Sequence, residues 1–130
     1  LTANFDLEAY GGLNQADHRV AGLATVDAVR DAANPWVFRR ELGEERPFEA
    51  RAIGILGHGE PTHAVPVDED AVQAAVTSLR QHEAYLEHIG DHPDPGEFIP
   101  EILRAGGEAA GCEYAVTIRL FDLGGLLPES

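Results

Sequence analysis

An Asp-His pair stands where a glycine-containing loop, residues 10–13, gives way to a predicted helix. The pair is Asp17-His18, within the segment Asn14–Arg19 (Asn-Gln-Ala-Asp-His-Arg). Such a junction can hold an imidazole rigidly and point it into a cleft. The positive end of the helix dipole disfavours the protonated ring, and the neutral ring is the form that binds a metal. His18 is therefore a candidate metal ligand, and Asp17 could orient a neighbouring donor or support the site from behind.

Spacing alone favours a simpler interpretation of the same residues. Asn14 is a good N-cap for the helix, and Asp17, three residues later, suits the positive end of the helix dipole. In that arrangement His18 has no role in chemistry.

The segment nevertheless resembles a known family motif. Asn14–Arg19, followed by Ala24–Val29 (Ala-Thr-Val-Asp-Ala-Val), is similar to the second signature of the PIG-L / LmbE-like zinc-dependent de-N-acetylases. The similarity continues in family order through Pro61–Val67, Leu79–His82 and Gly107–Gly111. It covers nearly the whole chain, which makes it far more specific than a lone Asp-His pair.

The resemblance implies a Rossmann-like α/β domain with one Zn²⁺, which activates an amide carbonyl and a water molecule. The second signature supplies one zinc ligand, which is His18 here. The family commonly has a His three residues before this ligand, where it stabilises the tetrahedral oxyanion, and this chain has Gln15 instead. A carboxamide can donate a hydrogen bond to an oxyanion but cannot deliver a proton. The resemblance thus implies a catalytic centre in which Gln15 lies beside the oxyanion. Asp17 would support the zinc ligand His18 without binding the metal itself.

A second histidine motif, His92-Pro93-Asp94-Pro95, imitates the family's other metal motif. That motif, Ala-His-Pro-Asp-Asp, follows the first strand in the family and supplies a His ligand, an Asp ligand and an Asp general base. Here the similar letters lie after a helix in the C-terminal half, and Pro95 replaces the ligand Asp. Proline cannot bind a metal, and Pro93 and Pro95 fit a rigid turn. The chain is therefore predicted to supply one of the three protein ligands that normally hold a catalytic zinc.

Two further features bear on the chain as a whole. It has no methionine, and it opens on Leu1–Phe5, which resembles the inside of a strand. We expect residues 1–130 to be the C-terminal portion of one deacetylase domain, with the N-terminal portion absent. By itself this fragment is expected to bind zinc poorly and to hydrolyse nothing.

Other histidines are candidates for substrate binding. His63, in the loop after the second strand, could line the mouth of the site, because α/β folds bind ligands beyond the carboxyl ends of strands; an exposed loop His is the alternative. His82 falls on or beside the apolar stripe of a long helix, where it is either buried and hydrogen-bonded or faces the active-site cleft. His58 and Glu60 flank Gly59, and nothing in the sequence fixes their geometry, so we interpret them as loop residues.

The elements that must position these residues follow an α/β pattern. Val20, Leu23 and Val26 are among the apolar positions that predict an amphipathic first helix, which Asn34-Pro35 ends. A buried apolar stripe is predicted on the second long helix and includes Val72, Val76, Leu79 and Leu86. The predicted fold class is α/β, strand-helix-strand-helix-helix-strand, as the C-terminal part of a Rossmann-like single domain. The predicted order is a strand over 1–6, a helix over 15–33, an irregular lobe over 35–50, a strand over 51–57, helices over 68–89 and 96–110, a strand over 114–121 and a frayed tail over 122–130.

Composition limits the partners. The formal net charge is −14, and so acidic a surface repels phosphate backbones and anionic membranes. The single Cys112 cannot form an internal disulfide, which fits a reducing cytoplasm. No apolar run approaches the roughly 20 residues of a membrane span. We therefore expect a cytoplasmic protein that binds a small molecule, an N-acetylated amino-sugar conjugate, and neither nucleic acid nor a membrane.

The function that the resemblance implies is hydrolysis of an N-acetyl group on a glucosamine-containing conjugate, with release of acetate. Two alternatives stay open. One is a non-catalytic binding or interaction module that keeps this part of the fold without the chemistry. The other is an unrelated hydrolase in which the His and Asp residues assemble a site through other geometry.

Overall fold

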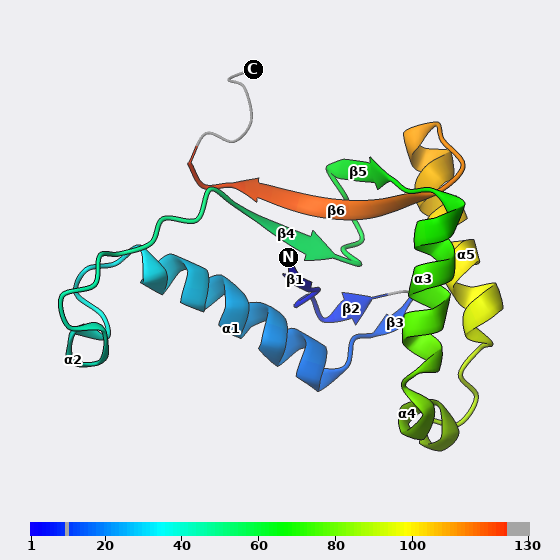
Figure 1. The fold of residues 1–130 in the computed structure, drawn as a ribbon, viewed down its shortest axis with the longest axis horizontal. Helices are drawn as coiled ribbons and strands as arrows, with labels where there is room; N and C mark the ends of the chain where they lie inside the picture. The colour runs from blue at the N-terminus through cyan, green and yellow to red at the C-terminus, as the bar shows by residue number, and fades with distance from the viewer. Residues whose placement is uncertain (10, 125–130) are drawn as a thin grey trace. The chain divides into compact units, whose positions relative to one another are not determined.

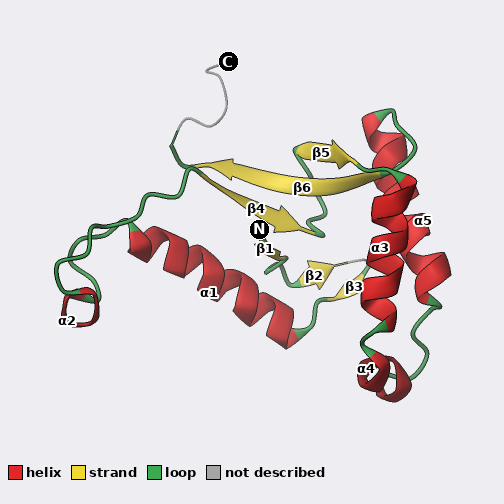
Figure 2. Ribbon diagram, in the orientation of Figure 1, coloured by secondary structure: helices red, strands yellow, loops and turns green. Residues whose placement is uncertain are grey.

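The computed structural model describes residues 1–9 and 11–124, which divide into two compact units. One unit comprises residues 1–63 and the described residues from 118 onward, and the other comprises residues 64–117. Figures 1 and 2 show their elements. Helices and a mixed sheet with the strand order β1-β4-β6-β5 confirm the predicted α/β class. None of the described helices is long and apolar enough to cross a membrane.

The first unit contains a parallel pair of strands. β1 (Thr2–Ala3) pairs with β4 (Ala52–Leu56), with Thr2 opposite Ile55. Ile53 and Ile55 are buried, as the apolar run predicts. β6 (Ala115–Asp122) confirms the last predicted strand and pairs antiparallel with β4. Because a Rossmann sheet is mostly parallel, this mixed sheet leaves the Rossmann-like description as a prediction.

The first helix, α1 (Ala16–Ala32), confirms the helix predicted over 15–33, but its buried face is smaller than the apolar spacing predicts. Val20 is 66% exposed and Leu23 is 49% exposed. The buried residue of α1 is Gly22, where an added β-carbon would stand 2.6 Å from the carbonyl oxygen of Ala3. The missing side chain at Gly22 therefore allows α1 to approach the backbone of β1 (Figure 1).

The loop predicted between the first strand and α1 contains two short strands. β2 (Glu8–Ala9) and β3 (Gly12–Leu13) pair antiparallel. Gly11 has a φ of 78°, a left-handed conformation that glycine adopts without strain. This pair could not be predicted from the sequence, because each strand has only two residues, too few for an alternating pattern.

The irregular lobe predicted over 35–50 contains one short helix, α2 (Arg39–Leu42). The remaining residues of this range have no regular secondary structure. Phe48 N–H donates to the carbonyl oxygen of Ala32 at 2.8 Å, which ties the end of the lobe to the end of α1.

The second unit packs α3 (Glu69–Arg80) against α5 (Pro95–Ala110), side by side in Figure 2. The carboxylate of Asp68 caps α3 by accepting the N–H of Ala71 at 2.9 Å. Val72 and Val76 are buried, which confirms this part of the predicted apolar stripe.

The single helix predicted over 68–89 is wrong. α3 stops at Arg80, and a separate helix, α4 (Glu83–His88), begins after His82. The ψ of His82 is 51°, outside the helical region, so the helix is interrupted there. The apolar spacing continues from Leu79 to Leu86 across the interruption, which is why the sequence pattern does not show it.

The C-terminal elements agree with prediction except at the tail. α5 ends at Gly111, whose φ of 75° gives the left-handed cap typical of glycine. The tail predicted over 122–130 begins later than expected, because Asp122 belongs to β6. Leu123 and Gly124 both donate their N–H groups to the carbonyl oxygen of Arg51. The rest of the predicted tail, 125–130, lies outside the described residues.

Candidate functional site

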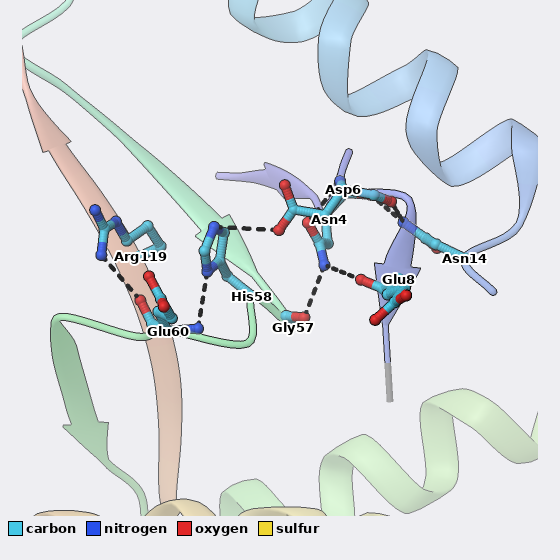
Figure 3. Close-up of polar contacts among 8 residues, drawn as sticks. All are labelled: Asn4, Asp6, Glu8, Asn14, Gly57, His58, Glu60 and Arg119. Atoms are coloured by element: carbon cyan, nitrogen blue, oxygen red, sulfur yellow. Dashed lines mark hydrogen bonds and ion pairs between the residues drawn. The ribbon is translucent and has the colours of Figure 1, made fainter. Parts of the chain in front are cut away.

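The carboxyl ends of β1 and β4 lie at the same edge of the sheet because the two strands are parallel. Ligands of α/β folds bind beyond such ends. The chain that leaves β1 runs through residues 4–14 to the start of α1, and the chain that leaves β4 turns at residues 57–60. Figure 3 shows side chains of the two segments facing one another.

Two buried asparagines, each 5% exposed, organise these segments. Asn4 Nδ2 donates to the carbonyl oxygens of Gly57 at 3.1 Å and of Glu8 at 3.4 Å, while Asn4 Oδ1 accepts the N–H of Asp6 at 2.9 Å. Asn14 Nδ2 donates to the carbonyl oxygens of Asn4 at 2.7 Å and of Asp6 at 3.0 Å. These amides hold the loop between β1 and α1 in shape and connect it to the end of β4.

Asn14 is not the N-cap of α1, contrary to the prediction. The N-cap is Gln15, whose backbone is extended and whose side chain makes no capping hydrogen bond. The amide of Asn14 points back to the loop because two carbonyl oxygens there accept both of its hydrogens. The part of the capping interpretation that concerns Asn14 is therefore wrong, whereas Asp17 lies in the first turn as that interpretation expects, and the role of His18 stays a prediction.

His18 lines a cavity of about 390 Å³ at this edge of the sheet. The ring is exposed, and no described residue donates to it, accepts from it or pairs with it. An imidazole with both nitrogens unused can bind a metal ion or a polar ligand. The other residues that line the cavity are Leu1, Thr2, Ala3, Asn4, Asn14 and Leu56.

Gln15 and Asp17 are exposed and do not line that cavity. Neither side chain has a partner among the residues that the structure describes. Asp17 lies in the first turn of α1, as predicted. The catalytic roles that the resemblance implies for both residues stay predictions.

Sequence reasoning missed an ordered histidine at this edge. His58 Nε2 lies 3.2 Å from Asp6 Oδ2, and the N–H of Glu60 donates to His58 Nδ1 at 2.9 Å. Arg119 Nη1 donates to the carbonyl oxygen of Glu60 at 3.2 Å, which connects the turn to β6 (Figure 3). His58 and Glu60 lie in a loop, as predicted, but these contacts give His58 a defined geometry that the sequence did not show. His58 directly follows the strand predicted over 51–57, and this position could have indicated that it lies at the carboxyl end of a strand.

His63 is the first residue of β5 (His63–Pro66), and the prediction of a loop there is wrong. The ring is exposed, in agreement with the exposed alternative. Thr62 Oγ1 accepts the N–H of Leu120 at 3.0 Å and lies 2.9 Å from His63 Nδ1. Which of the two atoms donates depends on the tautomer of the ring. No described residue contacts Nε2, so this nitrogen is available to a ligand.

His82 belongs to the second unit and is exposed, so the predicted burial is wrong. Its hydrogen bond is present: Nδ1 lies 2.9 Å from the carbonyl oxygen of Ser78. A carbonyl only accepts, so Nδ1 carries the proton and Nε2 keeps a free lone pair.

The segment that imitates the first metal motif starts a helix. Pro95 is the first residue of α5, a position that suits proline, so the predicted turn ends before it. Asp94 caps α5 by accepting the N–H of Gly96 at 2.8 Å. His92 donates from Nδ1 to the carbonyl oxygen of Pro93 at 2.7 Å. Over residues 1–9 and 11–124, no group of three or more His, Cys, Asp or Glu side chains could hold a metal ion.

No family model matches the sequence, and no curated protein matches it. Among solved structures, the chain is similar to the N,N'-diacetylchitobiose deacetylase from Pyrococcus horikoshii complexed with its inhibitor MPG, at a TM-score of 0.71 and 19% sequence identity. The chain has the fold of part of this deacetylase. The likeness covers 93% of this chain and 44% of that chain, so residues 1–130 span less than half the length of the deacetylase. At this identity the likeness supports the predicted resemblance at the level of the fold alone.

Proposed function

We propose that this chain forms part of the active site of a zinc-dependent deacetylase that acts on an N-acetylated amino sugar. The observation that carries the proposal is the unpartnered ring of His18, which lines a cavity that runs along β1 and reaches Leu56 at the carboxyl end of β4. Two arguments support it. The fold is shared with a deacetylase, and the sequence around His18 resembles the PIG-L / LmbE-like deacetylases.

His18 fits a zinc site as one ligand, because a neutral imidazole nitrogen is a common donor to this metal. The described residues bring no three donors together. We therefore propose that the other zinc ligands come from residues other than the described ones. A bound zinc ion would supply Lewis-acid activation of the amide carbonyl and of a water molecule.

The chain's own residues would bind and orient the substrate around that ligand. Gln15 can donate amide hydrogens to the oxygen that gains negative charge during attack, and Asp17 can orient a donor beside the ligand. Nε2 of His63 can donate to a sugar hydroxyl or accept from one, according to the tautomer of the ring. His82 belongs to the second unit, and its predicted role in substrate binding is a separate proposal.

Metal content and acetate release test the proposal. The protein that contains residues 1–130 is loaded with Zn²⁺, dialysed, and assayed on N,N'-diacetylchitobiose. We expect His18→Ala to lose both bound zinc and acetate release, because it removes a ligand. His88→Ala is the matched control, since this exposed ring donates to the carbonyl oxygen of Ala84 in α4. If His18→Ala kept both its zinc and its activity, the proposal would be wrong. If the wild-type protein bound zinc but released no acetate, the non-catalytic module would be favoured.

A further inference from the structure

Asp6 and His58 connect the two segments that leave the parallel strands. Asp6 follows β1, and His58 follows β4, so both side chains lie beyond the same edge of the sheet. Figure 3 shows the imidazole directed at the carboxylate across the gap between the two segments. The side chain of His58 is 16% exposed and that of Asp6 is 41% exposed.

Both nitrogens of His58 are already in use. Nδ1 accepts the N–H of Glu60, so in this arrangement it carries no proton. The neutral ring then has its proton on Nε2, which donates it to Asp6 Oδ2 at 3.2 Å. An imidazole engaged at both nitrogens is not free to bind a metal or to exchange a proton with a substrate. His58 is therefore suited to holding Asp6 in place.

The connection continues from Asp6 to the start of α1. Asn14 Nδ2 donates a hydrogen bond to the carbonyl oxygen of Asp6, and the backbone N–H of Asn14 donates to the carbonyl oxygen of Leu7 at 2.8 Å. The guanidinium of Arg19 donates back to the carbonyl oxygen of Asn14. Asn14 immediately precedes the N-cap, and His18 lies in the first turn that follows. A continuous series of contacts thus runs from the turn after β4 to the helix that carries His18.

We propose that Asp6 and His58 are a positioning pair, which holds the start of α1 and thereby fixes His18 at the edge of its cavity. The part that concerns a metal rests on the proposed function, whereas the part that concerns the start of α1 rests only on the contacts above. Asn4 makes a second connection between the same segments, through Gly57. Loss of the pair therefore loosens the start of α1 without releasing it.

Two substitutions of His58 separate its two hydrogen bonds. His58→Gln can still reach Asp6 with its Nε2 donor, and it loses the acceptor for Glu60. His58→Asn can still accept the N–H of Glu60, two residues on, as asparagine does in turns, and it is too short to reach Asp6. The proposal requires the connection to Asp6, so His58→Gln should behave like the wild-type chain and His58→Asn should not.

Hydrogen exchange of the Asn14 amide is the first measurement, because this N–H is protected by its bond to Leu7 and reports local opening. We expect His58→Asn to raise its exchange rate about three- to fivefold, the effect of losing one hydrogen bond to a partly exposed carboxylate. His58→Gln should stay within about twofold of wild type. Equal exchange in the two variants would overturn the proposal, whether both rise or neither does, because the connection to Asp6 would then not be what holds Asn14.

A Zn²⁺ titration followed through the NMR signals of the His18 ring is the second measurement. We expect zinc to bind His18 more weakly in His58→Asn by a similar factor, with His58→Gln close to wild type. Zinc affinity that is the same in both variants while Asn14 exchange differs would overturn the inference that the pair positions His18. A wild-type His18 that takes up no zinc at any concentration would instead count against the proposed function, and Asn14 exchange would then decide the pair alone.

Discussion

Gly22 of α1 and Ala3 of β1 meet backbone to backbone. A β-carbon added to Gly22 would stand 2.6 Å from the carbonyl oxygen of Ala3 and 3.0 Å from the β-carbon of Phe5. The first of these atoms belongs to a strand that is hydrogen-bonded to β4, so it cannot yield as a flexible side chain would. The glycine thus sets how closely the helix that carries His18 approaches the strand beneath it.

Gly22→Ala is therefore expected to destabilise the chain despite the better helix propensity of alanine. Overpacking against a backbone atom at 2.6 Å is expected to cost about 2–3 kcal/mol, the upper part of the usual range, against a gain of about 1 kcal/mol from propensity. Urea unfolding should show a net loss of about 1–2 kcal/mol. Gly12→Ala is the control, because nothing lies within 4 Å of an added β-carbon there. A Gly22→Ala chain as stable as wild type would show that α1 and β1 are not in close contact in solution.

Replacing Asn14 by aspartate distinguishes the observed structure from the simpler capping interpretation. If Asn14 were an N-cap, Asp would replace it without loss, because both residues cap well. In the structure its Nδ2 faces the carbonyl oxygens of Asn4 and Asp6. An aspartate would place an acceptor against two acceptors, which costs about 1–3 kcal/mol or more. We expect Asn14→Asp to lower the free energy of unfolding by at least that amount in a urea titration at neutral pH. A gain in stability would restore the capping interpretation.

Two valines test which helix is buried. Val72 in α3 is 0% exposed and Val20 in α1 is 66% exposed, although both occupy apolar positions of a predicted buried face. We expect Val72→Ala to lower the free energy of unfolding by about 1–3 kcal/mol, and Val20→Ala to change it by less than about 0.5 kcal/mol. Comparable losses in the two variants would show that Val20 is covered in solution.

The sequence predicted long elements and missed short ones, for physical reasons. α1, α5, β4 and β6 each carry enough residues for apolar spacing or end signals to be recognised. β2 and β3 are two residues each, and the interruption at His82 comes from its backbone angles, which the spacing of Leu79 and Leu86 does not record.

The candidate site was predictable only in part. His18 could be found because its local motif resembles a family signature. The hydrogen-bond partners of Asn14 and His58 could not be found, because Asn4 and Asp6 belong to a segment that approaches them only in the folded chain. The pairing of Asp6 with His58 depends on the register of β1 on β4, which local sequence does not show.

Zinc affinity of residues 1–130 by themselves tests whether one ligand is all that they provide. A catalytic zinc normally needs three protein ligands, and the described residues bring no three donors together. We expect metal analysis after dialysis to find far less than one zinc per chain, and the unfolding transition to be unchanged by a chelator. Stoichiometric zinc that survives dialysis would mean that the chain itself holds a complete set of ligands.

Gln15 provides the sharpest test of the proposed chemistry. It stands where the family that the chain resembles commonly has a histidine, and its side chain is exposed without a partner among the described residues. A carboxamide there can stabilise a developing oxyanion but cannot deliver a proton to the leaving nitrogen, whereas a protonated imidazole can do both. In the zinc-loaded protein that contains residues 1–130, Gln15→His should keep the zinc content and raise kcat for acetate release by at least about tenfold, since general acid catalysis typically contributes more than that. Gln15→Ala should also keep the zinc but lower kcat, because it removes the donor to the oxyanion. If Gln15→Ala left kcat unchanged, Gln15 would not face the reacting carbonyl, and its predicted place on the oxyanion side would be wrong even with His18 bound to zinc.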